Sequence, residues 1–138
     1  MSDADQANTF LRMAEKDSRA LVAMSDPNLF DVEIFGFHVQ QAVEKGLKAW
    51  LCLGDTRFPK KHDLLELNAL LGKSGIALPE SFIPLLDFTD FATTFRYDAY
   101  SEFDEKIDQA KTTALVEQFL AHVRQQSEMA QGPQGNRT

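Results

Sequence analysis

The feature that most constrains the fold is a long stretch of helical periodicity between Phe30 and Leu53. At 100° per residue, its apolar side chains fall on one broad face, and its polar side chains fall within an arc of roughly 140° on the other. Gly54 is a good C-terminal stop. The stretch therefore predicts a long helix with one buried face. The apolar positions are Phe35, Val39, Ala42, Val43, Gly46, Leu47, Ala49 and Trp50, and the polar positions are Gln40, Gln41, Glu44, Lys45 and Lys48.

Four further helices are predicted from capping residues and apolar spacing. Ser2 is the expected N-cap of the first helix, Asp63 of the third and Ser101 of the fifth, while Pro79 opens the fourth at its first position. Gly72 to Gly75 is expected to end the third helix. The predicted spans are about 3–24, 63–71, 79–95 and 102–128.

Each flanking helix has apolar residues at helical spacing, which predicts the side that it buries. The expected core positions are Phe10, Leu11, Ala14, Leu21 and Val22 in the first helix, Phe82, Ile83, Leu85, Leu86, Phe88, Phe91 and Ala92 in the fourth, and Ile107, Ala110, Ala114, Leu115, Phe119 and Val123 in the fifth.

These elements predict an all-α fold. No stretch shows strand alternation, and short connections between long helices favour antiparallel neighbours in an up-and-down bundle of four or five helices. With 138 residues, one domain is expected. We expect it to cover residues 1–130, and we expect residues 131–138, which contain glycine, proline and polar side chains, to form a flexible C-terminal tail.

Composition narrows the function classes. The net charge of −7 argues against a protein that coats nucleic acid non-specifically, although Arg57, Lys60, Lys61 and His62 form a local basic cluster. No apolar run reaches the roughly 18 residues of a membrane span, and the acidic start does not have the layout of a signal peptide. The single cysteine, Cys52, excludes an intramolecular disulfide. A cytoplasmic location is the default expectation.

Three blocks of sequence then resemble one known family. Residues 40–49 read Gln-Gln-Ala-Val-Glu-Lys-Gly-Leu-Lys-Ala, residues 61–64 read Lys-His-Asp-Leu, and Arg96-Tyr97 follows the fourth predicted helix. The HEPN family typically shows Gln-Gln-Ala-x-Glu-Lys-x-Leu-Lys-Ala, then Lys/Thr-His-Asp-Leu after a loop, then an Arg-Tyr pair. The segment from about Phe37 to Tyr97 is therefore similar to this family in the identity and the order of its blocks.

The resemblance implies an all-helical bundle that is usually a homodimer. Many members of the family are encoded beside a small nucleotidyltransferase and act as the toxin of a toxin–antitoxin pair. Members that are ribonucleases share a motif of Arg, four to six residues and His near the later helices. No His follows Arg96 within that window. The one formal match runs from Arg57 to His62, in the loop before the third helix, and we interpret it as coincidental.

The candidate site residues come from these blocks and from the basic cluster. His62 and Arg96 are the catalytic candidates. No metal site is predicted, because His38, His62 and His122 lack ligand spacing. No cofactor is predicted either. The candidate ligand-binding residues are Gln41, Lys45, Lys48, Arg57, Lys61, His62, Arg96 and Tyr97.

Each candidate also has a structural interpretation. His62 could order its loop or the start of the third helix. Lys45 and Lys48 could form a solvated helix face, with Glu44 and Lys48 in an i,i+4 ion pair. Arg96 could neutralise nearby acidic residues or cover carbonyls at the end of the fourth helix.

Three functions stay open at this point. The chain could be an interaction protein that pairs with a nucleotidyltransferase and binds nucleotide or RNA in a groove. It could be a metal-independent endoribonuclease that uses His62 with Arg57 or Arg96. It could also be a purely structural subunit that dimerises.

Overall fold

Helix α2 (Val32–Leu53) forms the centre of the molecule, because it contacts each of the other helical elements. The computed structural model describes residues 3–26, 28–54, 56–58, 60, 62–92 and 107–135. The other elements are helix α1 (Asp3–Ala23), helix α3 (Leu64–Lys73), the 3₁₀ helix η1 (Glu80–Ala92) and helix α5 (Gln109–Gly135). All the elements in these described ranges are helical, so the predicted all-α bundle is confirmed.

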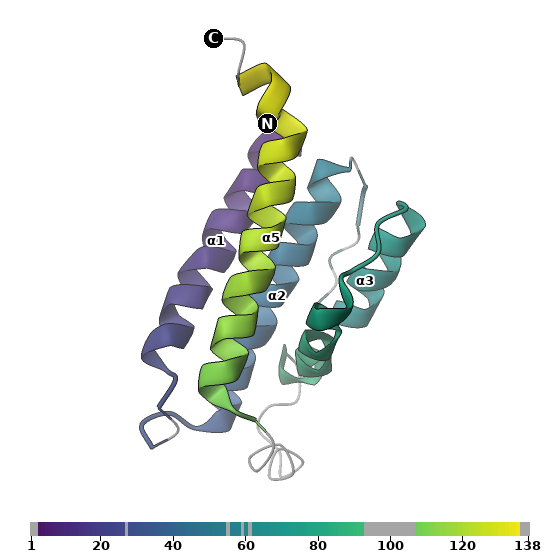
Figure 1. Cartoon of the computed structure of the whole chain (residues 1–138). Helices are drawn as coiled ribbons and strands as arrows, with labels where there is room; N and C mark the ends of the chain where they lie inside the picture. Colours follow the sequence, from purple (N-terminus) through teal and green to yellow (C-terminus); the bar gives the residue numbers. More distant parts are fainter. Residues whose placement is uncertain are drawn as a thin grey trace.

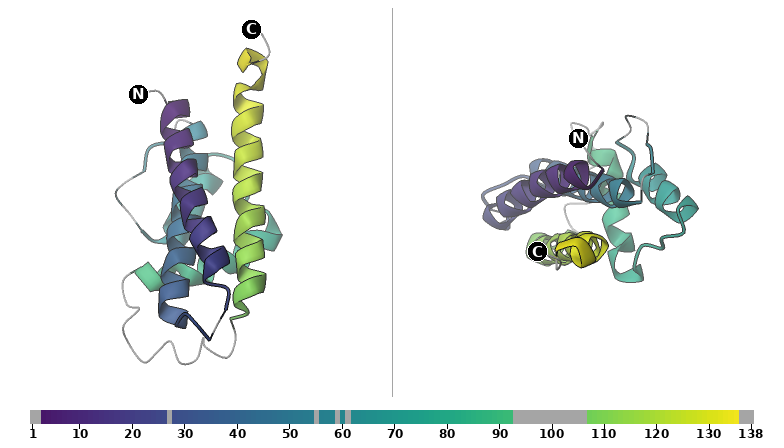
Figure 2. Two further views of the ribbon diagram at one scale, coloured as in Figure 1. Left: turned by 90° about the vertical axis from the view of Figure 1, so that its left-hand side faces the viewer. Right: turned by 90° about the horizontal axis from the view of Figure 1, so that it is seen from above.

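Helices α1, α2 and α5 lie side by side, and α3 packs on the opposite side of α2 from α1 (Figure 1). Seen along the bundle, α3 and η1 stand to one side of the three long helices (Figure 2). Helix α1 runs antiparallel to both α2 and α5, whereas α2 and α5 run in the same direction (Figure 1). After α2 the chain passes through α3 and η1 back to the end of the bundle where α2 began, so α5 can start there and run parallel to α2.

The apolar face predicted for α2 is buried in full, and it forms much of the core. Phe35 from α2, Phe91 from η1 and Phe119 from α5 are among the largest side chains that are completely buried. Two glycines let neighbouring elements approach α2. Gly36 lies directly under the Phe91 ring, and Gly46 lies under Phe119 and Leu120.

The ends of α2 and α5 differ from the prediction. Helix α2 begins at Val32 with Asp31 as its N-cap rather than at Phe30, and Asp108, whose carboxylate accepts from the Lys111 N–H at 3.0 Å, caps α5. Helix α5 continues to Gly135, so residues 131–135, which we assigned to the tail, are helical. Ser101, the expected cap of α5, lies outside the described residues.

Helix α3 continues through Gly72 to Lys73, beyond the predicted end at Leu71. The chain turns at Gly75, whose φ is 86°. The Ile76 N–H then donates to the Leu71 carbonyl at 3.0 Å, which satisfies a carbonyl of the last turn. Glycine is suited to this position because it adopts positive φ without a steric penalty.

The predicted fourth α-helix is instead a 3₁₀ helix, η1, with Pro84 inside it. Proline has no N–H for an i→i−4 bond, and its ring clashes with the carbonyl four residues earlier. Our prediction used Pro79 as a helix opener and overlooked this second proline. The expected end of the element near Phe95 lies outside the described residues.

The buried positions of α1, η1 and α5 were only partly predicted. Val22, Ile83, Ala110 and Ala114 are exposed rather than buried. On α5 the buried strip includes polar side chains, and the Thr113 hydroxyl bonds to the Leu21 carbonyl of α1 at 3.5 Å. The residues that α5 buries are Gln109, Thr113, Val116, Phe119, Leu120, Val123 and Ser127.

The close contact between α2 and α5 can be tested at Gly46. In Gly46→Ala the new Cβ would lie 2.5 Å from Phe119 Cε2 and 2.9 Å from Leu120 Cδ2, so these two side chains, or the helix that carries them, have to shift. We expect the free energy of unfolding to fall by about 1–3 kcal/mol, measured by urea denaturation. The matched control is Gly72→Ala, in α3, where no heavy atom lies within 4 Å of the added Cβ. That variant is expected to gain about 0.5–1 kcal/mol, and equal effects at both sites would contradict the packing described.

Candidate functional site

The carboxylate of Glu44 is buried on α2 and is bound by its own helix on both sides. Lys48 Nζ lies 2.9 Å from Glu44 Oε2, and Gln40 Nε2 donates to Glu44 Oε1 at 2.9 Å. These three residues are spaced four apart, so they form one strip along the helix. The predicted ion pair between Glu44 and Lys48 is therefore confirmed.

The same strip holds His62, which precedes helix α3. Nδ1 of His62 lies 3.1 Å from both carboxylate oxygens of Glu44, and the His62 carbonyl accepts from Gln40 Nε2 at 2.8 Å. An ionised carboxylate only accepts hydrogen bonds, so Nδ1 carries a proton, and its N–H donates the hydrogen bond to Glu44. The His62 side chain remains 63% exposed. This leaves Nε2 as the ring nitrogen for contact with an external group.

Glu44 is ionised because of these partners. Burial alone would raise the pKa of its carboxyl group, but the hydrogen bonds from Lys48, Gln40 and His62, together with the charge of Lys48, outweigh that effect. The pKa of Glu44 is consequently lower than its ordinary value of 4.5. We call these four residues the Glu44 cluster: Gln40, Glu44, Lys48 and His62. Within it, the imidazole of His62 faces a fixed negative charge.

The residues that follow His62 are fixed by η1. Asp63 caps α3 by accepting from the Leu65 N–H at 2.9 Å, which confirms the predicted cap. The Thr89 hydroxyl of η1 donates to Asp63 Oδ1 at 3.3 Å and accepts from the Leu64 N–H at 2.8 Å. His62 is thus held by α2 on one side, and its neighbours are held by η1 on the other.

Lys45 belongs to a different contact, with helix α1. Its Nζ lies 2.7 Å from Asp17 Oδ2, and His38 Nδ1 lies 3.5 Å from the other oxygen of Asp17. Lys48 pairs instead with Glu44. The structure therefore directs the two lysines toward different neighbours, and each has an acidic partner. Gln41 donates to Gln40 Oε1 at 2.7 Å and supports the strip from its edge.

The loop between α2 and α3 carries the other described candidate, Arg57. Arg57 and Lys60 are both exposed. Between them, the Phe58 ring packs against Phe10 of α1 with centroids 6.1 Å apart, and Lys48 Nζ lies 5.8 Å from the centre of that ring. Phe58 thus connects the loop to the Glu44 cluster. Lys61, Arg96 and Tyr97 lie outside the described residues.

Gln40 and Glu44 were not among the site residues predicted from the sequence. Both were placed on the solvent side of α2, yet Gln40 is 0% exposed and Glu44 is 5% exposed. A signal was available, since Gln40, Glu44 and Lys48 are spaced at i, i+4 and i+8 and include opposite charges. The helical pattern alone does not show that the following loop covers this strip.

Within the described part of the chain, no group of three or more His, Cys, Asp or Glu side chains is arranged to hold a metal ion. None of the described helices combines the length and the apolar character needed to cross a membrane.

The fold and this cluster define an all-α bundle in which a buried polar strip on the central helix holds a histidine at the start of the next. The family model described as HEPN domain matches residues 7–126, so the chain belongs to the HEPN family. Searches of curated proteins and of solved structures found no significant match. Membership supports a nucleotide- or RNA-associated role in general terms, and HEPN domains often dimerise.

The charge on Glu44 leads to a prediction about stability and pH. Because its pKa is lowered by folding, its contribution to stability is complete above about pH 4.5 and is lost as the pH falls through the folded-state value. Glu44→Gln leaves Lys48 buried without its anionic partner, so we expect a loss of about 1–3 kcal/mol at pH 7. Urea denaturation between pH 3 and pH 7 should show that the difference in the free energy of unfolding between the parent protein and Glu44→Gln becomes smaller as the pH falls.

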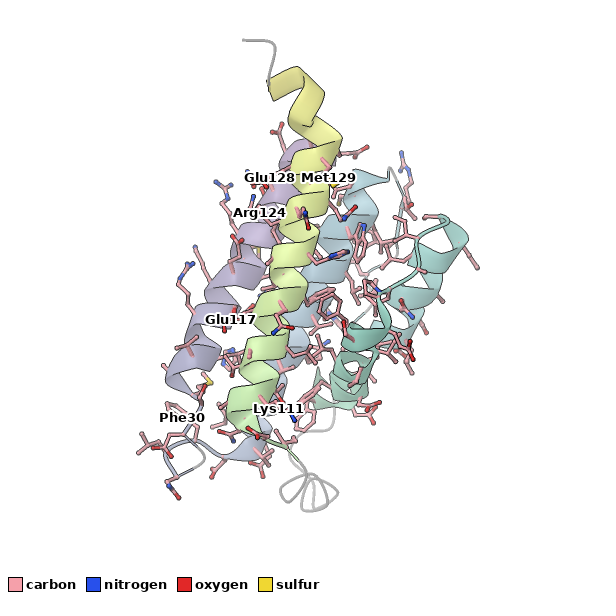
Figure 3. All side chains as sticks on the ribbon, viewed as in Figure 1. Phe30, Lys111, Glu117, Arg124, Glu128 and Met129 are labelled. Atoms are coloured by element: carbon pink, nitrogen blue, oxygen red, sulfur yellow. The ribbon has the colours of Figure 1, made fainter. Side chains whose placement is uncertain are left out.

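The control for this series is Glu117→Gln, because Glu117 is exposed on α5 (Figure 3). Its stability should stay within about 0.5 kcal/mol of the parent protein at pH 7. If the difference between Glu44→Gln and the parent were the same at every pH, Glu44 would not be the ionised centre of the cluster.

Proposed function

We propose that this chain is a nucleotide- or RNA-associated HEPN protein in which the exposed imidazole of His62 contacts the ligand. The observation that carries the proposal is the pairing of His62 Nδ1 with the buried carboxylate of Glu44 while the ring stays 63% exposed. A carboxylate on Nδ1 fixes the orientation and the tautomer of an imidazole. The ring is thus held in place with its second nitrogen available to a ligand.

The chemistry of this nitrogen suits a phosphate. A protonated imidazole donates through both nitrogens, here Nδ1 to Glu44 and Nε2 to a phosphate oxygen. Lys45 and Lys48 are paired with acidic side chains of the same chain, so in this proposal they stabilise the fold around His62 and do not contact the ligand.

Calorimetry with ATP, GTP and a short RNA tests the contact. In His62→Ala we expect the dissociation constant to rise about tenfold, because a hydrogen bond to a charged phosphate is lost. Lys111→Ala is the control, since it removes an exposed cation from a different helix (Figure 3). Unchanged affinity in His62→Ala, or absence of binding by the parent protein at millimolar ligand, would refute the proposal.

A second candidate function is a metal-independent endoribonuclease. The observation that favours it is again the contact of Glu44 with Nδ1, because a neutral imidazole held in this way can accept a proton at Nε2 from a ribose hydroxyl. In this mechanism either Arg57 or Arg96 would steady the phosphate. Arg57 is exposed in the same loop as His62.

If this activity exists, purified protein should cleave RNA in the presence of EDTA. General acid–base catalysis typically contributes about 10²–10⁴-fold, so His62→Ala should lower the rate by at least about a hundredfold. The cleavage products should be resolved by gel electrophoresis and compared over pH 5 to 8. Cleavage that persists in His62→Ala would show that His62 is not the acid–base group.

The proposal also includes two protein partners. We infer a homodimer and a small nucleotidyltransferase with which the chain forms a toxin–antitoxin pair, in the cytoplasm. Family membership supports both partners.

A further inference from the structure

A pocket of about 550 Å³ is lined by residues from the start of α1, the end of α2 and the loop that follows α2. Helix α1 begins and helix α2 ends at the same end of the bundle (Figure 1). The pocket is lined by Asp3, Gln6, Cys52, Thr56, Arg57 and Phe58. Its volume falls in the range of roughly 300–1,000 Å³ that is usual for small-molecule sites. The Glu44 cluster does not line it, so the pocket is a separate feature.

The loop that forms one wall is anchored on both sides of Arg57. The Thr56 N–H donates to the Leu51 carbonyl at 3.0 Å, and the Thr56 hydroxyl lies 2.6 Å from that of Ser74, just after α3. On the other side, Phe58 packs against Phe10. Arg57 is therefore presented at the pocket from a fixed backbone, with its side chain exposed.

The walls of the pocket differ in chemistry. Arg57 offers a planar fork of donors that matches phosphate, and Phe58 offers an aromatic ring. Asp3 places a carboxylate in the same pocket, which disfavours a bare anion but accepts hydrogen bonds from the N–H groups of a base. This combination suits a ligand that carries both a phosphate and a hydrogen-bonding aromatic ring.

Cys52 does not make the pocket a site of covalent chemistry. Burial, followed by the nearby charge of Asp3, raises the pKa of its thiol, so it stays protonated near neutral pH. The thiol lies 3.9 Å from Gln6 Oε1 and donates to it. Cys52 therefore lines the pocket as an uncharged side chain, and a ligand in the pocket would bind reversibly.

We propose that this pocket binds a nucleoside monophosphate, with the phosphate on Arg57 and the base against Phe58. The inference rests on the proposed nucleotide-associated function and assigns it a second contact surface. The two surfaces adjoin, because Lys48 Nζ lies 5.8 Å from the centre of the Phe58 ring and 2.9 Å from Glu44, which holds His62. A longer ligand could therefore reach both surfaces.

The test is a titration of the ¹⁵N-labelled full chain with GMP, AMP and inorganic phosphate, followed by NMR. We expect the signals of Gln6, Thr56 and Arg57 to shift with both nucleotides, and inorganic phosphate to bind more weakly. In Arg57→Gln the nucleotide affinity should fall about tenfold. Lys60→Gln removes an exposed charge three residues further along the loop, outside the pocket lining, and should change the affinity less than twofold.

The outcomes separate this inference from the function proposed for His62. Shifts at the pocket that persist in His62→Ala support the pocket, even if the role of His62 fails. Shifts confined to His62 and its neighbours would overturn the pocket while leaving the proposed function in place. Equal losses in Arg57→Gln and Lys60→Gln, or equal binding of phosphate and nucleotide, would also overturn it.

Discussion

The structure depends on the burial of one negative charge, that of Glu44. A buried carboxylate is costly unless it is paired and hydrogen-bonded, and removal of one partner leaves the charge uncompensated. Lys48 and Gln40 supply that compensation from the same helix, and His62 supplies it from the next segment of the chain. The requirement to satisfy Glu44 therefore fixes where the chain enters α3.

This requirement explains why two blocks of the sequence belong together. Gln40 bonds both to Glu44 and to the His62 carbonyl, so a single side chain joins the central helix to the loop. Asp63 then caps α3 and is held by Thr89 of η1. The position of the imidazole is thus a consequence of contacts among three elements rather than of its own loop.

The sequence predicted the parts of the fold that depend on local pattern, and it failed where a neighbour decides the outcome. The apolar face of α2 and the Asp63 cap follow from periodicity and side-chain chemistry, and both were predicted correctly. Gln40 and Glu44 were placed on the solvent side, because polarity along a helix does not reveal that a loop covers it. Thr113 on α5 is a similar case, because it is a polar residue that was not predicted to be buried and that packs against α1. Pro84, by contrast, was a visible local signal that should have argued against an α-helix.

The distribution of charge limits how such a protein can recognise phosphates. The net charge of −7 repels nucleic acid at long range, but screening confines this effect to a Debye length of roughly 8 Å at physiological salt. Lys45 and Lys48 are both paired with acidic side chains. Attraction then depends on short-range contacts in the loop that carries Arg57 and His62. A ligand selected in this way is recognised by the geometry of a few fixed groups, which favours a small or single-stranded ligand over a long duplex.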